Sequence, residues 1–331
     1  MTLHRVLRIV RIVSITVIVV LAAGTFATAA LIFFDRPGDD PPGIEDVAAA
    51  APAAEAAPRE VFTAFDGAEL GYRAHDGGAE GLPLVVLVHG AGLDGRQLDA
   101  LAAALADEGL ADVVVPDLRG HGPGPDGRSD VTYIGQLEDD IAELIEHRRR
   151  DGQQVVLGGH SWGGGLAVRF AGGPWGGLID RAVLLAPHLG ADAPTMRDGA
   201  DAWLRMSPLR MRGLRLLDRL GIAHWHDLPV VRFTFPEALD EGFGEAIVRE
   251  YSFRLDAALT PRGPAQDDIA QLPEFLLVAG REDTLFRAEL YEPFLSDGTA
   301  RGEYVLLDEV GHFDLVEAPR TRAALAEWLA R

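Results

Sequence analysis

Residues 154–165 read QVVLGGHSWGGG, and this stretch decides the fold. Its apolar run ends in GHSWG at 159–163, a G-x-S-x-G pattern, and helix-forming sequence follows at once. In a strand–turn–helix of this kind, a sharp and strained turn lifts the serine clear of the backbone. The helix then passes so close to the strand that side chains at 159 and 163 would collide. The pattern predicts a nucleophile at Ser161, although a glycine-rich turn with an incidental serine would give the same letters.

Outward from this stretch, apolar runs typical of buried strands alternate with helical patterns. The runs are Leu84–Val88, Asp112–Pro116, Gln154–Leu157, Arg181–Leu185, Glu274–Val278 and Glu303–Leu307, and the helical patterns are Gln97–Ala106, Tyr133–Arg149 and Trp162–Ala171. Two short segments on either side of Asp66-Gly67 predict a β-hairpin before them. The alternation predicts a mostly parallel central sheet with helices on both faces. It breaks after Pro187, so we expect a helical cap over 188–270, inserted after the sixth strand.

Two further side chains fall in loops that follow strands. Asp283 ends the segment GRED after the strand EFLLVA, and His312 lies in GHF after the strand EYVLL. Ser161, Asp283 and His312 then all lie at the sheet edge where open α/β sheets bind ligands. A serine, an acid and a histidine in contact are the components of nucleophilic acyl transfer. Glu282 is the rival for the acid, but its side chain should point to the other side of the loop.

Acyl transfer also requires hydrogen-bond donors for the developing oxyanion. The segment HGAG at 89–92 follows the strand LVVLV, which is the loop position from which one donor comes. The residue after the nucleophile supplies the other donor. We therefore expect the backbone N–H groups of Ala91 and Trp162 to form the oxyanion hole. His89, His121 and His160 are expected to be structural hydrogen-bonding residues.

Five segments together carry a family resemblance: HGAG at 89–92, DLRGHG at 117–122, GHSWGG at 159–164, GREDT at 280–284 and VGHF at 310–313. They resemble the α/β-hydrolase superfamily, and within it the monoacylglycerol lipase and lysophospholipase group, also called serine aminopeptidase S33. The resemblance covers residues 61–331 and implies the α/β-hydrolase fold. It also implies a serine hydrolase that cleaves carboxylic esters through Ser161, Asp283 and His312, with no cofactor and no metal. Trp162 departs from the methionine common in that group and resembles proline iminopeptidases, which keeps an aminopeptidase or amidase open.

A different class of function also fits part of the sequence. Gly90, Gly92 and Gly95 form a G-x-G-x-x-G pattern after a strand, and Asp117 ends the next strand. This arrangement is typical of dinucleotide-binding oxidoreductases. That reading leaves the serine motif, Asp283 and His312 unexplained, so it is the more distant alternative.

The first sixty residues differ in composition from the rest. Residues 12–34 contain no charged side chain, follow three arginines and precede an acidic segment. They predict a transmembrane signal anchor, with 1–11 cytoplasmic and the hydrolase domain outside the cell membrane. A cleaved signal peptide and secretion form the alternative. Residues 35–60 are rich in proline, alanine and acids and predict a disordered linker.

The net charge of the chain excludes one class of partner. The 51 acidic residues exceed the 30 basic ones, and the formal net charge of -21 argues against nucleic acid as a partner. The expected partners are a small-molecule or lipid ester as substrate and the membrane through the N-terminal helix. Residues 197–219 form a local exception, because six arginines are interleaved there with large apolar side chains. That patch suggests contact with anionic lipid or with a substrate phosphate, unless the arginines pair with neighbouring acids.

Overall fold

The main sheet of the computed structural model has eight strands in the spatial order β1-β2-β4-β3-β5-β6-β10-β11. The structure describes residues 3–38, 56–122, 128–198 and 203–331. The strands are β1 Glu60–Thr63, β2 Glu69–His75, β3 Leu84–Val88, β4 Asp112–Pro116, β5 Val155–His160, β6 Arg181–Leu185, β10 Glu274–Gly280 and β11 Gly302–Leu307. Strand β2 is antiparallel to β1 and β4, and all other neighbours are parallel. The sequence prediction of a mostly parallel sheet is confirmed.

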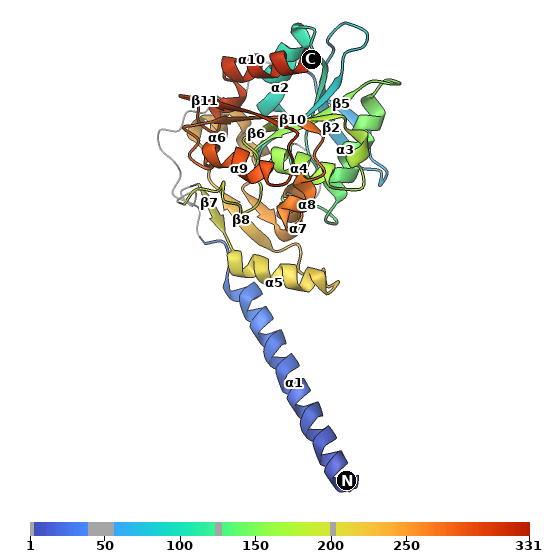
Figure 1. The fold of residues 1–331 in the computed structure, drawn as a ribbon, viewed down its shortest axis with the longest axis vertical. Helices are drawn as coiled ribbons and strands as arrows, with labels where there is room; N and C mark the ends of the chain where they lie inside the picture. The colour runs from blue at the N-terminus through green and yellow to red at the C-terminus, as the bar shows by residue number, and fades with distance from the viewer. Residues whose placement is uncertain (1–2, 39–55, 123–127, 199–202) are drawn as a thin grey trace.

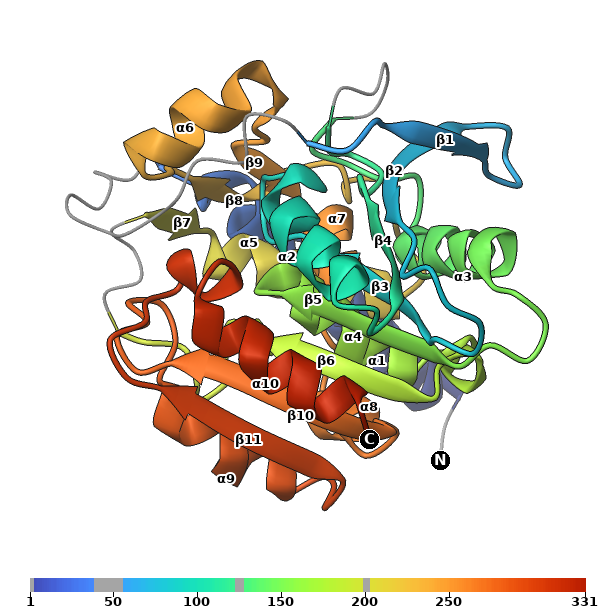
Figure 2. The same cartoon turned by 90° about the horizontal axis from the view of Figure 1, so that it is seen from above.

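Helices cover both faces of this sheet, as the continuous burial of its central strands requires. The views in Figures 1 and 2 show α2 (Arg96–Asp107) and α10 (Pro319–Leu329) over one face. The other face carries α3 (Gln136–Arg148), α4 (Trp162–Ala171) and α9 (Tyr291–Ser296). Every residue of β3, β4 and β5 is buried between the two layers. Because the strands from β4 to β11 run parallel, their carboxyl ends lie at one edge of the sheet.

The segment between β6 and β10 is the largest insertion in the sheet. It contains helices, as expected, but also a three-stranded antiparallel sheet in the order β7-β8-β9, which the sequence did not predict. Its elements are β7 Leu204–Met206, α5 Pro208–Arg219, β8 Pro229–Phe233, α6 Glu237–Phe243, β9 Glu250–Ser252, α7 Phe253–Leu259 and α8 Ala265–Ile269. Two of these strands have only three residues and the third has five, which is too short for a clear alternating pattern, so the sequence of this region resembles a purely helical cap.

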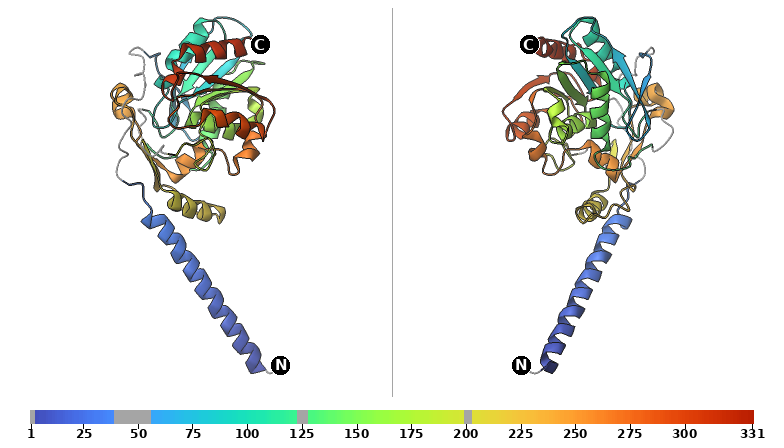
Figure 3. Two further views of the ribbon diagram at one scale, coloured as in Figure 1. Left: turned by 60° about the vertical axis from the view of Figure 1, so that its left-hand side comes forward. Right: turned by 90° about the vertical axis from the view of Figure 1, so that its right-hand side faces the viewer.

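The N-terminal helix α1 (Leu3–Phe34) extends away from the rest of the molecule, as Figures 1 and 3 show. Its last turns contact α5 of the insertion, where Ile32 is buried and its carbonyl oxygen accepts a hydrogen bond of 2.7 Å from Arg210 Nε. Asp35 continues this contact, because its Oδ2 accepts the N–H groups of Leu209 and Arg210 at 2.7 and 3.1 Å. The side chain of Asp35 therefore caps the N-terminus of α5.

The predicted transmembrane anchor at 12–34 is wrong. Within the described residues, no helix combines the length and apolarity that a membrane crossing needs. The prediction of a single-pass membrane protein with its hydrolase domain outside the cell membrane is therefore also wrong. The absence of charge in this run favours a lipid environment, but its C-terminal end packs against α5 of the insertion. Of the predicted linker 35–60, residues 39–55 lie outside the described residues, and Arg59 near its end binds Asp117 at 2.8 Å.

Candidate active site

Ser161 occupies the turn between β5 and α4 in a strained backbone conformation. Its φ is 56° and its ψ is -118°, a combination that non-glycine residues rarely adopt. Hydrogen bonds hold the turn from both sides, because Ser161 N–H donates to Leu185 O at 2.9 Å and His188 N–H donates to Ser161 O at 2.8 Å. A Cβ on Gly163 would lie 2.3 Å from Val88 O, so only glycine fits where the helix passes the strand. The expected close approach at this position is therefore present.

The structure brings Asp283 and His312 to Ser161. His312 Nδ1 donates to Asp283 Oδ2 at 2.8 Å, and His312 Nε2 lies 3.0 Å from Ser161 Oγ. The other carboxylate oxygen of Asp283 accepts the N–H groups of Leu285 and Phe286 at 2.7 and 2.9 Å. All three side chains are at most 3% exposed. With Nδ1 donating to the acid, Nε2 is free to accept the serine proton.

Glu282, the rival acid, does not reach this site. It is exposed, whereas its neighbour Asp283 is buried. Its own N–H donates to Val310 O at 3.0 Å, which fixes the loop between β10 and the following segment. The alternation of side-chain direction along the loop therefore separates the two acids as expected.

The loop at 89–92 leaves one N–H group unused beside Ser161. Gly90 N–H donates to Gln97 Oε1 at 2.7 Å, and Gly92 N–H donates to Tyr251 OH at 2.7 Å. Between them, the N–H of Ala91 has no acceptor in the part of the chain that the structure describes. Trp162 is the first residue of α4, so its N–H has no partner within the helix. These are the two donors that the sequence predicted for an oxyanion.

His160 and Gln97 connect this loop to His312. Gln97 Nε2 donates to His160 Nδ1 at 2.9 Å, and His160 Nε2 donates to the carbonyl oxygen of His312 at 3.0 Å. Burial lowers the pKa of His160 well below its ordinary value, which keeps its Nδ1 unprotonated and able to accept. The histidine is structural, as predicted. Gln97 was not predicted as part of the site, because a glutamine in a helix carries no signal of its contacts.

His121, in the loop after β4, contacts Tyr251 of the insertion, which in turn contacts the loop at 89–92. Its Nδ1 donates to Arg119 O at 3.2 Å, and its Nε2 accepts the hydroxyl proton of Tyr251 at 2.6 Å. Burial is the main cause that lowers the pKa of His121 to about 3, and the nearby His89 adds to it. Neutral His121 thus orients the hydroxyl that accepts the Gly92 N–H. Tyr251 comes from β9, a distant part of the chain, and no sequence pattern indicated it.

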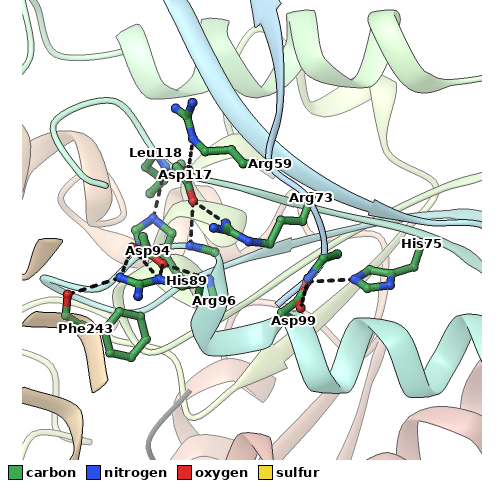
Figure 4. Close-up of polar contacts among 12 residues, drawn as sticks. Arg59, Arg73, His75, His89, Asp94, Arg96, Asp99, Asp117, Leu118 and Phe243 are labelled. Atoms are coloured by element: carbon green, nitrogen blue, oxygen red, sulfur yellow. Dashed lines mark hydrogen bonds and ion pairs between the residues drawn. The ribbon is translucent and has the colours of Figure 1, made fainter. Parts of the chain in front are cut away.

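The dinucleotide alternative does not fit the residues that would have to carry it. Figure 4 shows Asp117 bound by Arg59 and Arg73, at 2.8 and 2.9 Å, and its Oδ1 also accepts the Gly95 N–H at 3.0 Å. Burial alone would raise the pKa of Asp117, but the Arg59 and Arg73 contacts outweigh it and the pKa is lowered. Asp117 therefore stabilises the loop at 89–95 from within and is not available to a ribose. The glycine N–H groups at 90, 92 and 95 likewise have protein partners.

Arginines of the stretch at 197–219 are engaged within the protein. Arg210 is buried and donates to the carbonyl oxygens of Ile32 and Pro229, both at 2.7 Å. Arg197 donates to Asp283 O at 2.7 Å and so supports the loop that carries the acid. Asp201, which belonged to the predicted patch, lies outside the described residues. Two of the six arginines thus hold backbone carbonyls and are not free to bind an anionic surface.

Little free space adjoins Ser161. The space beside it measures about 10 Å³ and is lined by Ser161, His312 and seven neighbours, which are Gly90, Ala91, Leu93, Gln97, His160, Trp203 and Phe313. A larger cavity of about 550 Å³ lies between α5, α7 and the loop after β6, and its lining includes none of the loops that carry Ser161, Asp283 and His312. Asp256, which lines the larger cavity, accepts the indole N–H of Trp162, the residue after Ser161, at 3.5 Å. Burial raises the pKa of Asp256 to about 6.

Comparison with known proteins gives the site a context. Residues 85–325 match the alpha/beta hydrolase family. An uncharacterized protein of Mycobacterium tuberculosis is 33% identical over 107 residues, which are 31% of this chain and 29% of that protein. An esterase of Thermogutta terrifontis, solved with malate bound, is 25% identical, with a TM-score of 0.58 over 83% of this chain and 98% of the esterase. A monoglyceride lipase of Saccharomyces cerevisiae, solved with a substrate analog, is 19% identical, with a TM-score of 0.65 over 84% and 96% of the two chains.

Proposed function

Because this chain belongs to the alpha/beta hydrolase family, we propose that it is a serine hydrolase that cleaves carboxylic esters. One observation carries the proposal. His312 lies between Ser161 Oγ, at 3.0 Å, and Asp283 Oδ2, at 2.8 Å, with Nδ1 donating to the acid. A histidine in that orientation can take the serine proton through Nε2. The likeness to the Thermogutta terrifontis esterase supports an ester as the bond that is cleaved.

The reaction would proceed in two halves. His312 accepts the proton of Ser161 as Oγ attacks the ester carbonyl, and Asp283 stabilises the imidazolium that forms. The N–H groups of Ala91 and Trp162 then donate to the tetrahedral oxyanion. Collapse of this intermediate expels the alcohol, which takes its proton from His312, and leaves an acyl group on Ser161. Water activated by His312 attacks the acyl-enzyme and releases the acid.

Within the esters, we propose lipid monoesters as the substrate class. The fold of the monoglyceride lipase of Saccharomyces cerevisiae matches this one over 84% of the chain, which supports the proposal at the level of the fold. Leu93, Trp203 and Phe313 line the space beside Ser161. Trp203 also packs on Trp162 and Phe233 behind this lining. Such a lining favours an apolar acyl chain over a charged one.

Hydrolysis of an amide is the second candidate. It rests on the tryptophan that follows the serine, a residue that resembles the proline iminopeptidases in this position. The same histidine would then protonate an amine as the leaving group. Amino-acid arylamides and p-nitrophenyl esters of equal size separate the two candidates, because each releases a coloured product only when its own bond is cleaved.

The test is hydrolysis of p-nitrophenyl esters from acetate to palmitate by the full chain, beside its Ser161→Ala variant. We expect turnover by the wild type and a loss of about 10³-fold or more in the variant, because the nucleophile is removed. Label transfer from a fluorophosphonate to the wild type, and none to the variant, should accompany it. Folded wild-type protein without turnover of any ester, or turnover that persists in S161A, would disprove the proposal.

A further inference from the structure

Trp203 closes the space beside Ser161. Apart from Trp203, that space of about 10 Å³ is lined by residues within 90–97, 160–161 and 312–313, which all belong to the body of the hydrolase. Among the described residues, Trp203 is the one lining residue that comes from the insertion between β6 and β10. A space of this size holds about one water molecule, or a group as small as a methyl, and no long acyl chain. A long acyl chain can therefore lie beside Ser161 only if part of this wall moves.

Aromatic packing holds the Trp203 ring, and no hydrogen bond to a described residue adds to it. The ring is 2% exposed and stacks on Phe233, with centroids 5.9 Å apart at an interplanar angle of 28°. It meets Phe313 edge to face at 5.8 Å and lies 6.4 Å from the His312 ring. Its indole N–H is buried and has no hydrogen-bond partner among the described residues. Burial of a donor without a partner costs free energy that exposure to water would recover.

Trp162 provides the contrast within the same cluster. It is also fully buried and meets Trp203 edge to face at 6.1 Å, but its indole N–H has Asp256 as an acceptor. It also stacks on His188 with centroids 4.0 Å apart. Trp162 is therefore anchored by a polar contact, and Trp203 is not. Of the two indoles, Trp203 loses less when it leaves its site.

The rest of the insertion is firmly attached to the oxyanion loop. The N–H of Gly92 donates to the Tyr251 hydroxyl at 2.7 Å, and the carbonyl oxygen of Gly92 accepts the Val248 N–H at 2.8 Å. Arg96 at the start of α2 donates to Phe243 O at 3.3 Å, as Figure 4 shows. Movement of the whole insertion would break these bonds and disturb the loop that holds the Ala91 N–H. A rotation of the Trp203 side chain opens the space without that cost.

From these contacts we infer that Trp203 is the specificity-determining residue of this site: its ring limits the size of ester that reaches Ser161, and large lipid esters enter by displacing it. The inference rests on the proposed ester hydrolysis and adds a size limit to it. The cost of displacing the ring falls only on esters that need the space, and it reduces their apparent affinity by the fraction of molecules in the open form.

The experiment compares full-length wild type with Trp203→Ala and Trp203→Phe on p-nitrophenyl acetate and decanoate. The quantity measured is the ratio of kcat/KM for decanoate to that for acetate. We expect this ratio to rise about tenfold or more in W203A, because the ring no longer has to be displaced, and by a smaller factor in W203F. A second series, with methyl and decyl alcohols esterified to acetate, detects a limit on the leaving-group side. W203F decides the test if W203A does not fold.

Trp175→Ala is the matched control. Trp175 is a partly exposed tryptophan whose indole N–H donates to Asp139 at 2.7 Å on the surface, away from Ser161. Its ratio should stay within about twofold of the wild type, because nothing at the site changes. Unchanged ratios in both series for folded W203A and W203F, while the wild type hydrolyses esters and S161A does not, would overturn the inference. Failure of the proposed function looks different, because then no protein in the set would hydrolyse an ester.

Discussion

Lowering the pH should destabilise this protein through His121, and the size of the effect follows from its surroundings. Burial lowers the pKa of His121 to about 3 in the folded state, whereas a histidine in an unfolded chain has a pKa of about 6.5. The unfolded chain therefore binds a proton that the folded chain rejects. This contribution is fully present above the unfolded pKa, is lost as the pH falls below it, and levels off only near pH 3.

The magnitude can be worked out for a convenient interval. At pH 5 the unfolded histidine is about 1.5 units below its pKa, and each unit is worth about 1.36 kcal/mol, so His121 costs about 2 kcal/mol between pH 7 and pH 5. Buried His160 and His188 also have lowered pKa values and add to the total. A comparison with His121→Gln isolates the single residue, because the other groups are common to both proteins. Glutamine can still accept the Tyr251 hydroxyl proton.

The assay is urea unfolding of wild type and H121Q at pH 7 and pH 5, followed by tryptophan fluorescence. We expect the free energy of unfolding to fall by about 2 kcal/mol less in H121Q than in the wild type over this interval. His224→Gln, at an exposed position of the insertion, should show the wild-type fall. Equal losses in wild type and H121Q, to within about 0.5 kcal/mol, would refute the reasoning, because His121 would then be free to take up a proton in the folded state.

Two further predictions concern the site itself. Asp283→Asn should lower kcat for p-nitrophenyl acetate by about 10⁴-fold, because an amide can no longer fix the His312 tautomer. The control Glu282→Gln, at an exposed position, should keep the wild-type kcat. A loss below about tenfold in D283N would show that another residue is the acid. Gly163→Ala should lower the free energy of unfolding by about 3 kcal/mol, since the new methyl group would lie 2.3 Å from Val88 O. Gly177→Ala, with open space around its Cβ, should cost less than about 1 kcal/mol in the same thermal or urea unfolding, and equal costs at both sites would contradict the close approach.

The strands were predictable because most of them are buried on both faces. Leu84–Val88, Asp112–Pro116 and Arg181–Leu185 agree with the observed bounds of β3, β4 and β6. A parallel strand between two helical layers has to be apolar at nearly every position, which makes it visible as an unbroken run. Residues 12–34 show the limit of that signal. Composition alone did not reveal that the end of this run packs against α5.

The positions of Ser161, Asp283 and His312 could be predicted because each follows a strand. Parallel topology then places all three at one edge, and no knowledge of side-chain packing is needed. Gln97, Tyr251 and Trp203 are different. Gln97 reaches the site from within a helix, and the other two reach it from an insertion whose short strands left no periodic pattern. Their contacts depend on tertiary packing between segments far apart in the sequence.

The residues that would perform the chemistry and the residue that would limit access to them therefore belong to different parts of the chain. The turn at Ser161 and the segment at 89–92 have bonds within the body of the hydrolase, such as Ser161 N–H to Leu185 O and Gly90 N–H to Gln97 Oε1. The insertion adds support through Tyr251, which accepts the Gly92 N–H, and Arg197, which donates to Asp283 O. Among the described residues, the insertion reaches the free space through the ring of Trp203, whose indole N–H has no hydrogen-bond partner there. A substitution at 203 can therefore change which molecules enter without disturbing the geometry at Ser161. Substitutions at Tyr251 or Arg96 would disturb it, because those side chains support the loop that carries the Ala91 N–H.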